Sequence, residues 1–177
     1  MEFPGLGSMA RDDEFGDYRS QPVPVPMLGG HRCRIVLGDY DDDPNPQDFH
    51  AAVRSFLSAD RRVLQEAAPH VYRYYLDCNS VWKPGDDEYV SIPDPASVWA
   101  HVQFGDEAFV SRRLDGDQRV YVSLESECDW EPEHGLHIVF KDGMRVNKVG
   151  DYDGHVSNAD AYGDPRLEDV VYRSFRD

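Results

Sequence analysis

The segment 128–140, CDWEPEHGLHIVF, places carboxylates, imidazoles and an indole directly ahead of an apolar run. A mixture of imidazole and carboxylate ligands suits zinc or another transition metal ion. The candidate ligands in this segment are His134 and His137 with Glu131 or Glu133. Residues three apart on a strand point to opposite faces, so the two histidines converge only if Gly135 introduces a bulge. The segment therefore predicts a metal site only on that condition.

The segment GDYDGH, residues 150–155, is a second source of ligands. Asp151, Asp153 and His155 alternate along it. An extended backbone would therefore bring two aspartates and an imidazole to one face, where they could hold a divalent cation. The pair Asp153-Gly154 is also a strong turn signal, and a turn would separate these side chains. If both segments folded against each other, they would form one divalent-metal site from His134, His137, Asp151, Asp153 and His155.

The residues of 128–140 also fit a structural turn between two strands, and this is the interpretation that we favour. Pro132 and Gly135 would break the chain, with Gly135 at a positive φ, while Trp130 would cover the open end of the sheet. Glu133 would accept hydrogen bonds from turn amides, and His134 would bond a neighbouring backbone group. Adjacent turn residues rarely point at one reacting atom, so we assign no catalytic role to Glu133 and His134.

Hydrophobic periodicity predicts two helices ahead of these segments. Apolar residues recur at helical spacing over residues 46–59, and Pro46 suits the first helical position. A second apolar stripe runs over residues 60–79, where Pro69 must bend or interrupt the helix. The aromatic residues of VYRYYLDCN lie on more than one helical face, which favours a helix packed against a sheet.

From residue 98 onward the sequence changes to short strands and turns. The strand candidates are VWAHVQF, AFVSRRL, RVYVSLESEC, LHIVF and RVNKVG, and together they predict an antiparallel meander. Strand alternation divides residues 119–127 between two sides of the sheet. One side carries Val120, Val122 and Leu124 and is expected to be buried. The other side carries Arg119, Tyr121, Ser123 and Glu125 and can meet solvent or a partner.

These elements predict an α+β fold, in which two N-terminal helices pack on an antiparallel meander sheet and a short C-terminal helix in DPRLEDVVYRSF closes the domain. A chain of 177 residues suits one such domain, which we place at residues 31–177. Residues 1–30, with the alternating prolines of QPVPVPM, are expected to form a disordered or extended arm. Residues 1–8 resemble the remnant of an expression tag.

The chain is strongly acidic, with 34 Asp and Glu residues against 18 Lys and Arg residues and a formal charge of -16. Such a field repels phosphate backbones and anionic membranes, so we expect no nucleic acid and no membrane as partner, but a basic protein. The alternative explanation of the negative charge is that it only keeps the protein soluble. The three cysteines are far apart in the sequence, which indicates reduced thiols in a cytoplasmic protein. We expect no cofactor, with a divalent metal as the alternative.

Four stretches together resemble an uncharacterised bacterial family that is known only as a domain of unknown function. They are DYDDDPNPQDF, HVYRYYLDCN, CDWEPEHGL and VGDYDGH, within residues 35–155. Members of that family share an acidic segment ahead of a helix, and a tryptophan followed by acidic residues and Glu-His-Gly-Leu. The resemblance implies a single small α+β domain, and it implies no catalytic residues.

Our leading hypothesis is a non-enzymatic cytoplasmic protein-binding module, immunity-like or regulatory, that acts through an acidic surface with aromatic anchors. Its candidate contact residues are Tyr121, Trp130, Glu133 and His134. The alternative is a metal-dependent hydrolase whose ligands and general base come from the segments 128–140 and 150–155. A third option, an assembly subunit, differs by predicting self-association through the exposed face of the sheet.

Overall fold

One large sheet organises the chain in the computed structural model, which describes residues 1–176. Among these residues the sheet has eight strands, in the order β10-β9-β8-β7-β6-β4-β3, and β5 also pairs with β6. The strands are β3 (Ala10–Arg11), β4 (Tyr18–Arg19), β5 (Val23–Pro24), β6 (Arg32–Leu37), β7 (Val102–Arg112), β8 (Val120–Cys128), β9 (Leu136–Lys141) and β10 (Arg145–Gly150). A short hairpin of β1 (Glu2–Phe3) and β2 (Gly7–Ser8) lies outside it. The protein therefore has a mixed α and β fold around a mainly antiparallel sheet.

The central strands combine the predicted antiparallel meander with one parallel pair. β7, β8, β9 and β10 pair antiparallel in sequence order, whereas β6 runs parallel to β7. Parallel neighbours need a long crossover, and α1 (Pro46–Ser58) and α2 (Arg62–Asn79) supply it between β6 and β7. The sequence did not predict this pair, because local periodicity does not report which distant strand lies alongside another.

The two long helices lie close to their predicted bounds. α2 continues through Pro69, which the sequence analysis expected to bend or interrupt it. Two 3-10 helices, η2 (Tyr40–Asp42) and η3 (Pro95–His101), lie in the connections before α1 and after α2. Among the described residues, no helix has the length and apolar character needed to cross a membrane.

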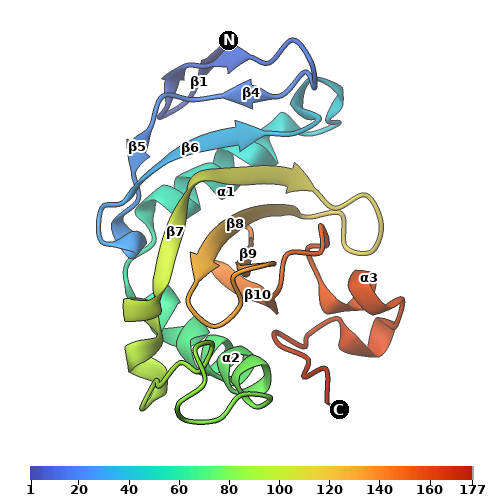
Figure 1. Cartoon of the computed structure of the whole chain (residues 1–177). Coiled ribbons are helices and arrows are strands. Elements are labelled where there is room, and N and C mark those ends of the chain that lie inside the picture. Colours follow the sequence, from blue (N-terminus) through green and yellow to red (C-terminus); the bar gives the residue numbers. More distant parts are fainter. Residues whose placement is uncertain (177) are drawn as a thin grey trace.

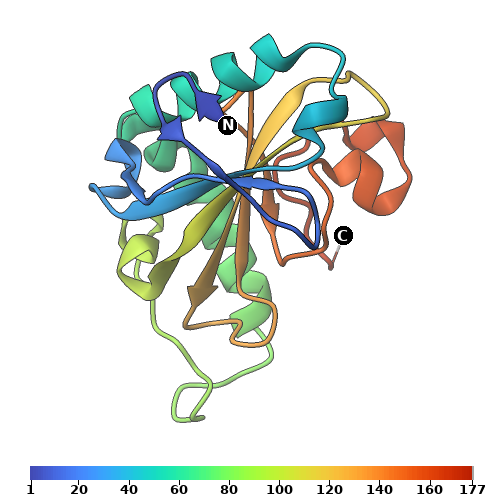
Figure 2. The same cartoon turned by 90° about the horizontal axis from the view of Figure 1, so that it is seen from above.

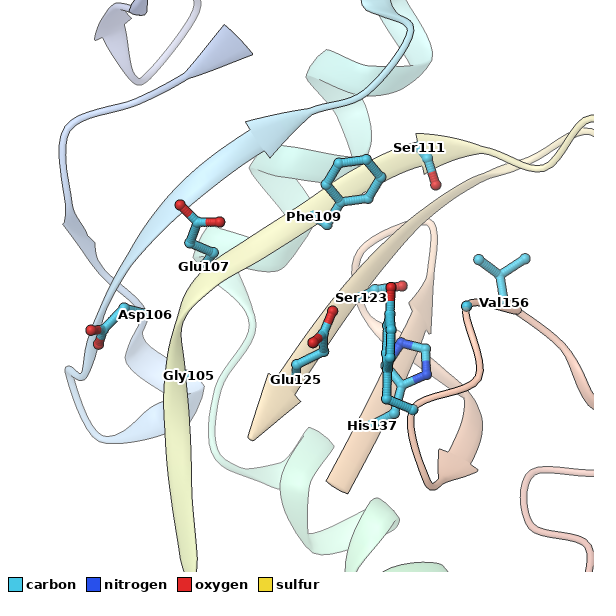
Figure 3. A pocket seen from close by; sticks show the side chains of 11 residues that line it. Gly105, Asp106, Glu107, Phe109, Ser111, Ser123, Glu125, His137 and Val156 are labelled. Carbon is cyan, nitrogen blue, oxygen red and sulfur yellow. The ribbon is translucent and has the colours of Figure 1, made fainter. Parts of the chain in front are cut away.

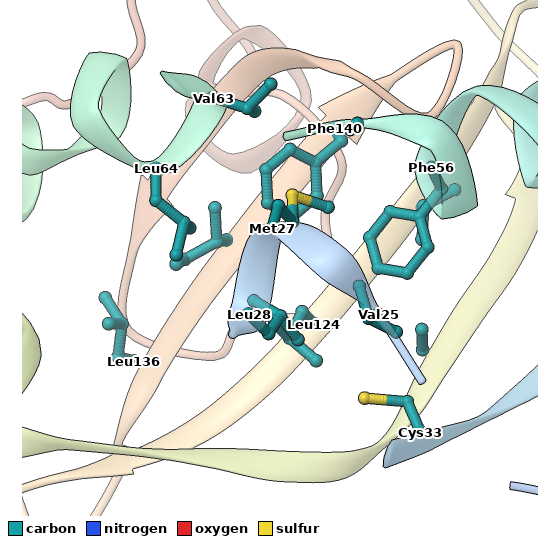
Figure 4. Close-up of a cluster of buried hydrophobic side chains, with 14 of the residues drawn as sticks. Val25, Met27, Leu28, Cys33, Phe56, Val63, Leu64, Leu124, Leu136 and Phe140 are labelled. Carbon is teal, nitrogen blue, oxygen red and sulfur yellow. The ribbon is translucent and has the colours of Figure 1, made fainter. Parts of the chain in front are cut away.

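The helices α1 and α2 pack against one face of the sheet, which we call the inner face (Figure 1). α1 contacts β7 and β8, α2 contacts β10, and Figure 2 shows α1 along one side of the strands. The space between them is filled by large apolar side chains (Figure 4). The rings of Phe56 in α1 and Phe140 in β9 have centroids 5.8 Å apart, and both side chains are fully buried. The inner face is therefore the hydrophobic core.

Residues 1–30 belong to the folded body, which differs from the predicted disordered or extended arm. β3 and β4 extend the sheet beyond β6, and β5 pairs with β6. Val25 follows β5 and Met27 lies within η1 (Pro26–Leu28), and both side chains are fully buried. Phe3, in the expected tag remnant, is 3% exposed and joins the core.

The C-terminal region also differs from the predicted helix in DPRLEDVVYRSF. The helix α3 (Asn158–Tyr162) comes earlier and ends at Gly163, which has a left-handed φ of 63°. The predicted segment contains the 3-10 turn η4 (Pro165–Leu167). Beyond it, the Val149 amide donates a hydrogen bond of 2.8 Å to the Val171 carbonyl. A backbone bond to β10 thus forms where the apolar spacing predicted helix.

Candidate binding groove on the outer sheet face

The face of the sheet opposite the two long helices, which we call the outer face, carries polar side chains of the central strands. Strand alternation turns Val122 and Leu124 of β8 inward and Ser123 and Glu125 outward. In the register of β8 with β9, Glu125 stands directly opposite His137. Cβ atoms of such antiparallel partners lie about 4.5–5.5 Å apart, so a carboxylate and an imidazole are neighbours on the outer face.

Two adjoining hollows on this face form what we call the outer groove, and Figure 3 shows residues that line the first of them. Their volumes are about 360 and about 380 Å³, and they share Gly105, Glu125 and Tyr152. Other residues that line the first hollow are Asp106, Glu107, Phe109, Ser123 and His137, and the second is lined also by Glu127, Glu133 and His134. The groove therefore crosses β7, β8 and β9 and reaches the segment that follows β10.

Gly105 shapes the rim of the groove. The pairing of β7 with β8 shifts register within residues 104–108, so β7 carries a bulge there. A Cβ atom on Gly105 would lie 2.2 Å from the carbonyl oxygen of Glu125, so the close approach of the two strands requires glycine. The adjacent Asp106 and Glu107 are both exposed, which places their carboxylates at the rim.

Glu125 is a carboxylate with no cation beside it. Within residues 1–176 its side chain forms no hydrogen bond and no ion pair, whereas the neighbouring Glu107 is paired with Arg19 of β4. Partial desolvation by the walls of the groove, with a smaller contribution from Glu107, raises the pKa of Glu125 above its ordinary value. A cation bound next to Glu125 would offset both effects.

His137 is a buried imidazole, and neither of its ring nitrogens has a hydrogen-bond partner within the described chain. The residue is 1% exposed, and the Tyr152 ring packs edge to face on it with centroids 5.2 Å apart. Burial, together with the nearby charge of Lys148, lowers the pKa of His137 to about 4, so the imidazole is neutral at neutral pH. Leaving a buried polar group unpaired costs about 1–3 kcal/mol, which a bound ligand could recover.

Two exposed aromatic rings flank these polar groups. Phe109 of β7 is 39% exposed, and Tyr152 is 49% exposed. Gly38 makes room for the Phe109 ring, since a Cβ atom at this position would lie 2.5 Å from its Cζ atom. The Tyr152 amide donates to the His134 carbonyl at 3.4 Å, which links the segment after β10 to the turn before β9. Exposed apolar rings around a hollow are typical of binding surfaces.

The turn before β9 is held by aromatic residues of α2. Trp130 is 3% exposed and packs edge to face on Tyr74 and Tyr75. The Tyr74 hydroxyl donates a hydrogen bond of 3.0 Å to the carbonyl of Gly135, whose φ is 63°. The positive φ agrees with the sequence analysis. Trp130 therefore supports the turn from inside, and it is not available as a surface anchor.

Glu131, Glu133 and His134 form a cluster at the tip of this turn. Their candidate ligand atoms all lie within 4.8 Å of one another, and among residues 1–176 they are the one group of at least three such side chains. The Nδ1 atom of His134 lies 3.3 Å from Oε1 of Glu131. His137 stands apart from this cluster, because β9 begins at Leu136 and turns the His137 side chain onto the outer face.

The aspartates and the histidine after β10 are held by other contacts. The buried Lys148 forms an ion pair with Asp153, and this pair holds the pKa of the Asp153 carboxyl below its ordinary value, although burial opposes the shift. The Asp153 carboxylate also accepts from the His155 amide at 3.0 Å, as in an Asx-turn. Asp151 is exposed. Within the described residues, the five metal ligands predicted from sequence therefore do not form one cluster.

Of the four contact residues predicted from sequence, two line the groove and two are buried. Glu133 and His134 are exposed in its second hollow. Tyr121 is fully buried on the outer face, and its hydroxyl donates to Asp117 at 2.9 Å. Trp130 is buried beneath the turn.

Sequence reasoning placed Glu125 on the outer face and named His137, but it missed Phe109 and Tyr152. Phe109 lies in an apolar strand, so its outward direction is visible only from its register with Ser123. Tyr152 reaches the groove through the path of the chain after β10, which no local pattern reports.

Comparison with known proteins gives a family match and no functional relative. The sequence model of a family described as "Domain of unknown function (DUF6985)" matches residues 5–156, which include the whole outer groove. No curated protein matches the chain, and no solved structure matches it. The function therefore has to be argued from the groove itself.

Proposed function

The chain belongs to the DUF6985 family, whose function is unknown, and we propose that it is a non-enzymatic binding module whose outer groove receives a basic segment of a partner protein. Such a partner fits an immunity-like or regulatory role, in which carboxylates steer association and aromatic rings anchor it. The observation that carries the proposal is Glu125, a partly desolvated carboxylate with no cation beside it among residues 1–176, in a groove flanked by the exposed rings of Phe109 and Tyr152.

The charge of the groove supports a basic partner. Five carboxylates line the two hollows: Asp106, Glu107, Glu125, Glu127 and Glu133. No lysine or arginine of the described chain lines either hollow. The whole protein carries a formal charge of -16, which attracts a cationic partner over long distances and concentrates it near this face. Glu107 is paired with Arg19, but Glu125 has no cation beside it among the described residues, which favours binding over solubility as the role of this surface.

The proposal is tested with a basic peptide and an acidic peptide of the same length. We expect the protein to bind the basic peptide at low ionic strength, less at high ionic strength, and the acidic peptide not at all. Fluorescence anisotropy measures the dissociation constant. Glu125→Gln should weaken binding about tenfold or more, because it removes the carboxylate that the cation meets in the groove.

The matched control is Glu88→Gln, which changes the net charge equally in the exposed loop after α2, outside the groove. The control should bind like the parent protein. Equal weakening by both variants would mean that only net charge matters and would contradict a binding site in the groove.

A metal-dependent hydrolase is the second candidate, and the cluster of Glu131, Glu133 and His134 is the observation in its favour. The geometry supports it less than binding. His134 is 58% exposed and its ring already contacts Glu131, whereas catalytic metal sites lie in enclosed cavities with an open coordination position.

A further inference from the structure

We propose that the outer groove is a receptor for an arginine side chain, in which Glu125 and His137 accept hydrogen bonds from the guanidinium group and Phe109 and Tyr152 contact its faces. The inference rests on the proposed function and deepens it, because it names the chemical group that the groove recognises.

The two acceptors are cross-strand neighbours on the outer face. Glu125 and His137 stand directly opposite each other on β8 and β9, and both line the first hollow (Figure 3). A guanidinium presents five N–H donors in a planar fork and has no acceptor. It can therefore donate to a carboxylate and to a neighbouring imidazole nitrogen at the same time.

The protonation state of His137 suits a ligand that only donates. Burial lowers the pKa of His137 to about 4, so at neutral pH one ring nitrogen carries a lone pair. Neither nitrogen has a partner among the described residues. Glu125 is exposed to solvent, and no donor of the described chain reaches its carboxylate. An arginine would satisfy two acceptors that the protein itself leaves unpaired.

The walls of the groove favour arginine over lysine. The guanidinium is flat, more weakly hydrated than an ammonium group, and stacks on aromatic faces. Phe109 and Tyr152 offer such faces, at 39% and 49% exposure. The first hollow, at about 360 Å³, has room for a single long side chain. Lysine would keep the ion pair with Glu125 but would lose the stacking and the second planar hydrogen bond.

Tyr152 controls access to His137. Its ring packs on the imidazole, whose nitrogens are buried, so an incoming guanidinium reaches them when the Tyr152 side chain rotates away. The segment that carries Tyr152 contains Gly154 at a φ of 77°, and the Tyr152 backbone stays bonded to the carbonyl of His134. The Tyr152 side chain is 49% exposed, so it can turn off the imidazole and onto the face of the guanidinium while its backbone remains in place.

The test uses three short peptides that differ at one central residue: arginine, lysine or citrulline, which keeps the shape of arginine without its charge. NMR titration of the whole isotope-labelled protein measures each dissociation constant and shows which residues respond. We expect the arginine peptide to bind about fivefold or more tightly than the lysine peptide. The citrulline peptide should not bind. The responding signals should include the imidazole of His137, and its two nitrogens should shift on binding.

Variants identify the groups that make the contact. Glu125→Gln and His137→Leu should each remove the preference for arginine over lysine, and Glu88→Gln should keep it. His137→Leu is expected to fold, since leucine has a volume similar to that of histidine, and its amide spectrum checks this.

The outcomes separate this inference from the proposed function. Equal binding of the arginine and lysine peptides, with both weakened by Glu125→Gln, overturns the arginine receptor and leaves a general basic-segment groove in place. Shifts confined to residues outside the groove also overturn it. If neither cationic peptide binds, the arginine receptor is overturned, and if the basic peptide used to test the proposed function also fails to bind, the proposed function is overturned with it.

Discussion

The inner and outer faces of the sheet are built from alternate residues of the same strands, yet they differ in how completely their side chains are paired. On the inner face, Leu124 of β8 and Phe140 of β9 are fully buried in one apolar core. On the outer face, the same two strands present Glu125 without a cation and His137 without a hydrogen-bond partner within residues 1–176. Because successive side chains of a strand point to opposite faces, the same two strands stabilise the core on one face and present unpaired polar groups on the other.

The outer face itself has a closed end and an open end. At the closed end, the guanidinium of Arg113 is buried and forms ion pairs with Asp160 and Glu168 from the C-terminal region. At the open end, Glu125 lies in the groove with no arginine or lysine of the described chain beside it. The closed end therefore shows a guanidinium held by carboxylates on this same face, which is the kind of contact proposed for the open end.

The largest expected effect comes from breaking the inner face. Phe140→Ala should lower the free energy of unfolding by about 3–5 kcal/mol, because it leaves a cavity against Phe56 in the core. Phe109→Ala, the matched change on the outer face, should cost about 1 kcal/mol or less, since that ring is already 39% exposed. Urea unfolding of both variants measures the difference. Equal losses would mean that the exposed ring is part of the core and not an open wall of the groove.

The next effect concerns pH and the buried imidazole. The pKa of His137 lies at about 4 in the folded protein and near its ordinary value of 6.5 in the unfolded chain. As the pH falls below 6.5 the unfolded chain gains a proton that the folded state does not, so stability decreases and the loss levels off below a pH of about 4. Between about pH 7 and about pH 5 the expected loss is about 2 kcal/mol.

Urea unfolding at a series of pH values measures this loss, and His137→Leu isolates it. The groups that face His137 are Lys148, Asp153, Glu125 and Tyr152. None of these is changed in the variant, so their own titration remains in both proteins. A parent and a variant with the same pH dependence would show that His137 is not held neutral by burial.

The sequence predicted the inner face better than the outer face, and the reason is physical. Helix bounds and the meander follow from periodicities of a few residues, which burial against one core enforces. The parallel pairing of β6 with β7 and the burial of Phe3 depend on contacts between distant parts of the chain. The groove depends on such contacts too, because the β7 bulge at Gly105 and the position of Tyr152 have no local signature.

The histidines illustrate the same limit. Strand alternation correctly predicted that His134 and His137 would point apart unless Gly135 introduced a bulge. The structure begins β9 at Leu136, so His137 enters the sheet while His134 stays in the turn. What alternation could not show was that His137 would be left without a partner in a groove beside Glu125.

A third substitution should stabilise the folded protein, by less than the core substitution destabilises it. His137→Leu is expected to raise the free energy of unfolding by about 1 kcal/mol at neutral pH, because it removes two buried nitrogens that lack partners and keeps a similar volume. Urea unfolding measures the gain, and the same variant should lose its preference for the arginine peptide. A variant that is less stable than the parent would mean that the His137 ring nitrogens already form hydrogen bonds in the unliganded protein, which would contradict their role as free acceptors for a ligand.

The smallest effect separates the two histidines by metal binding. Excess zinc should raise the melting temperature only slightly, corresponding to about 1 kcal/mol or less, because the ligand atoms of Glu131, Glu133 and His134 are close together but lie at an exposed turn. His134→Ala should abolish the shift, His137→Leu should retain it, and a chelator should leave the metal-free protein unchanged. Loss of the shift in His137→Leu would place both imidazoles on one ion. The turn and the outer groove would then be a single site, and the separation of a structural turn from an arginine-binding face would fail.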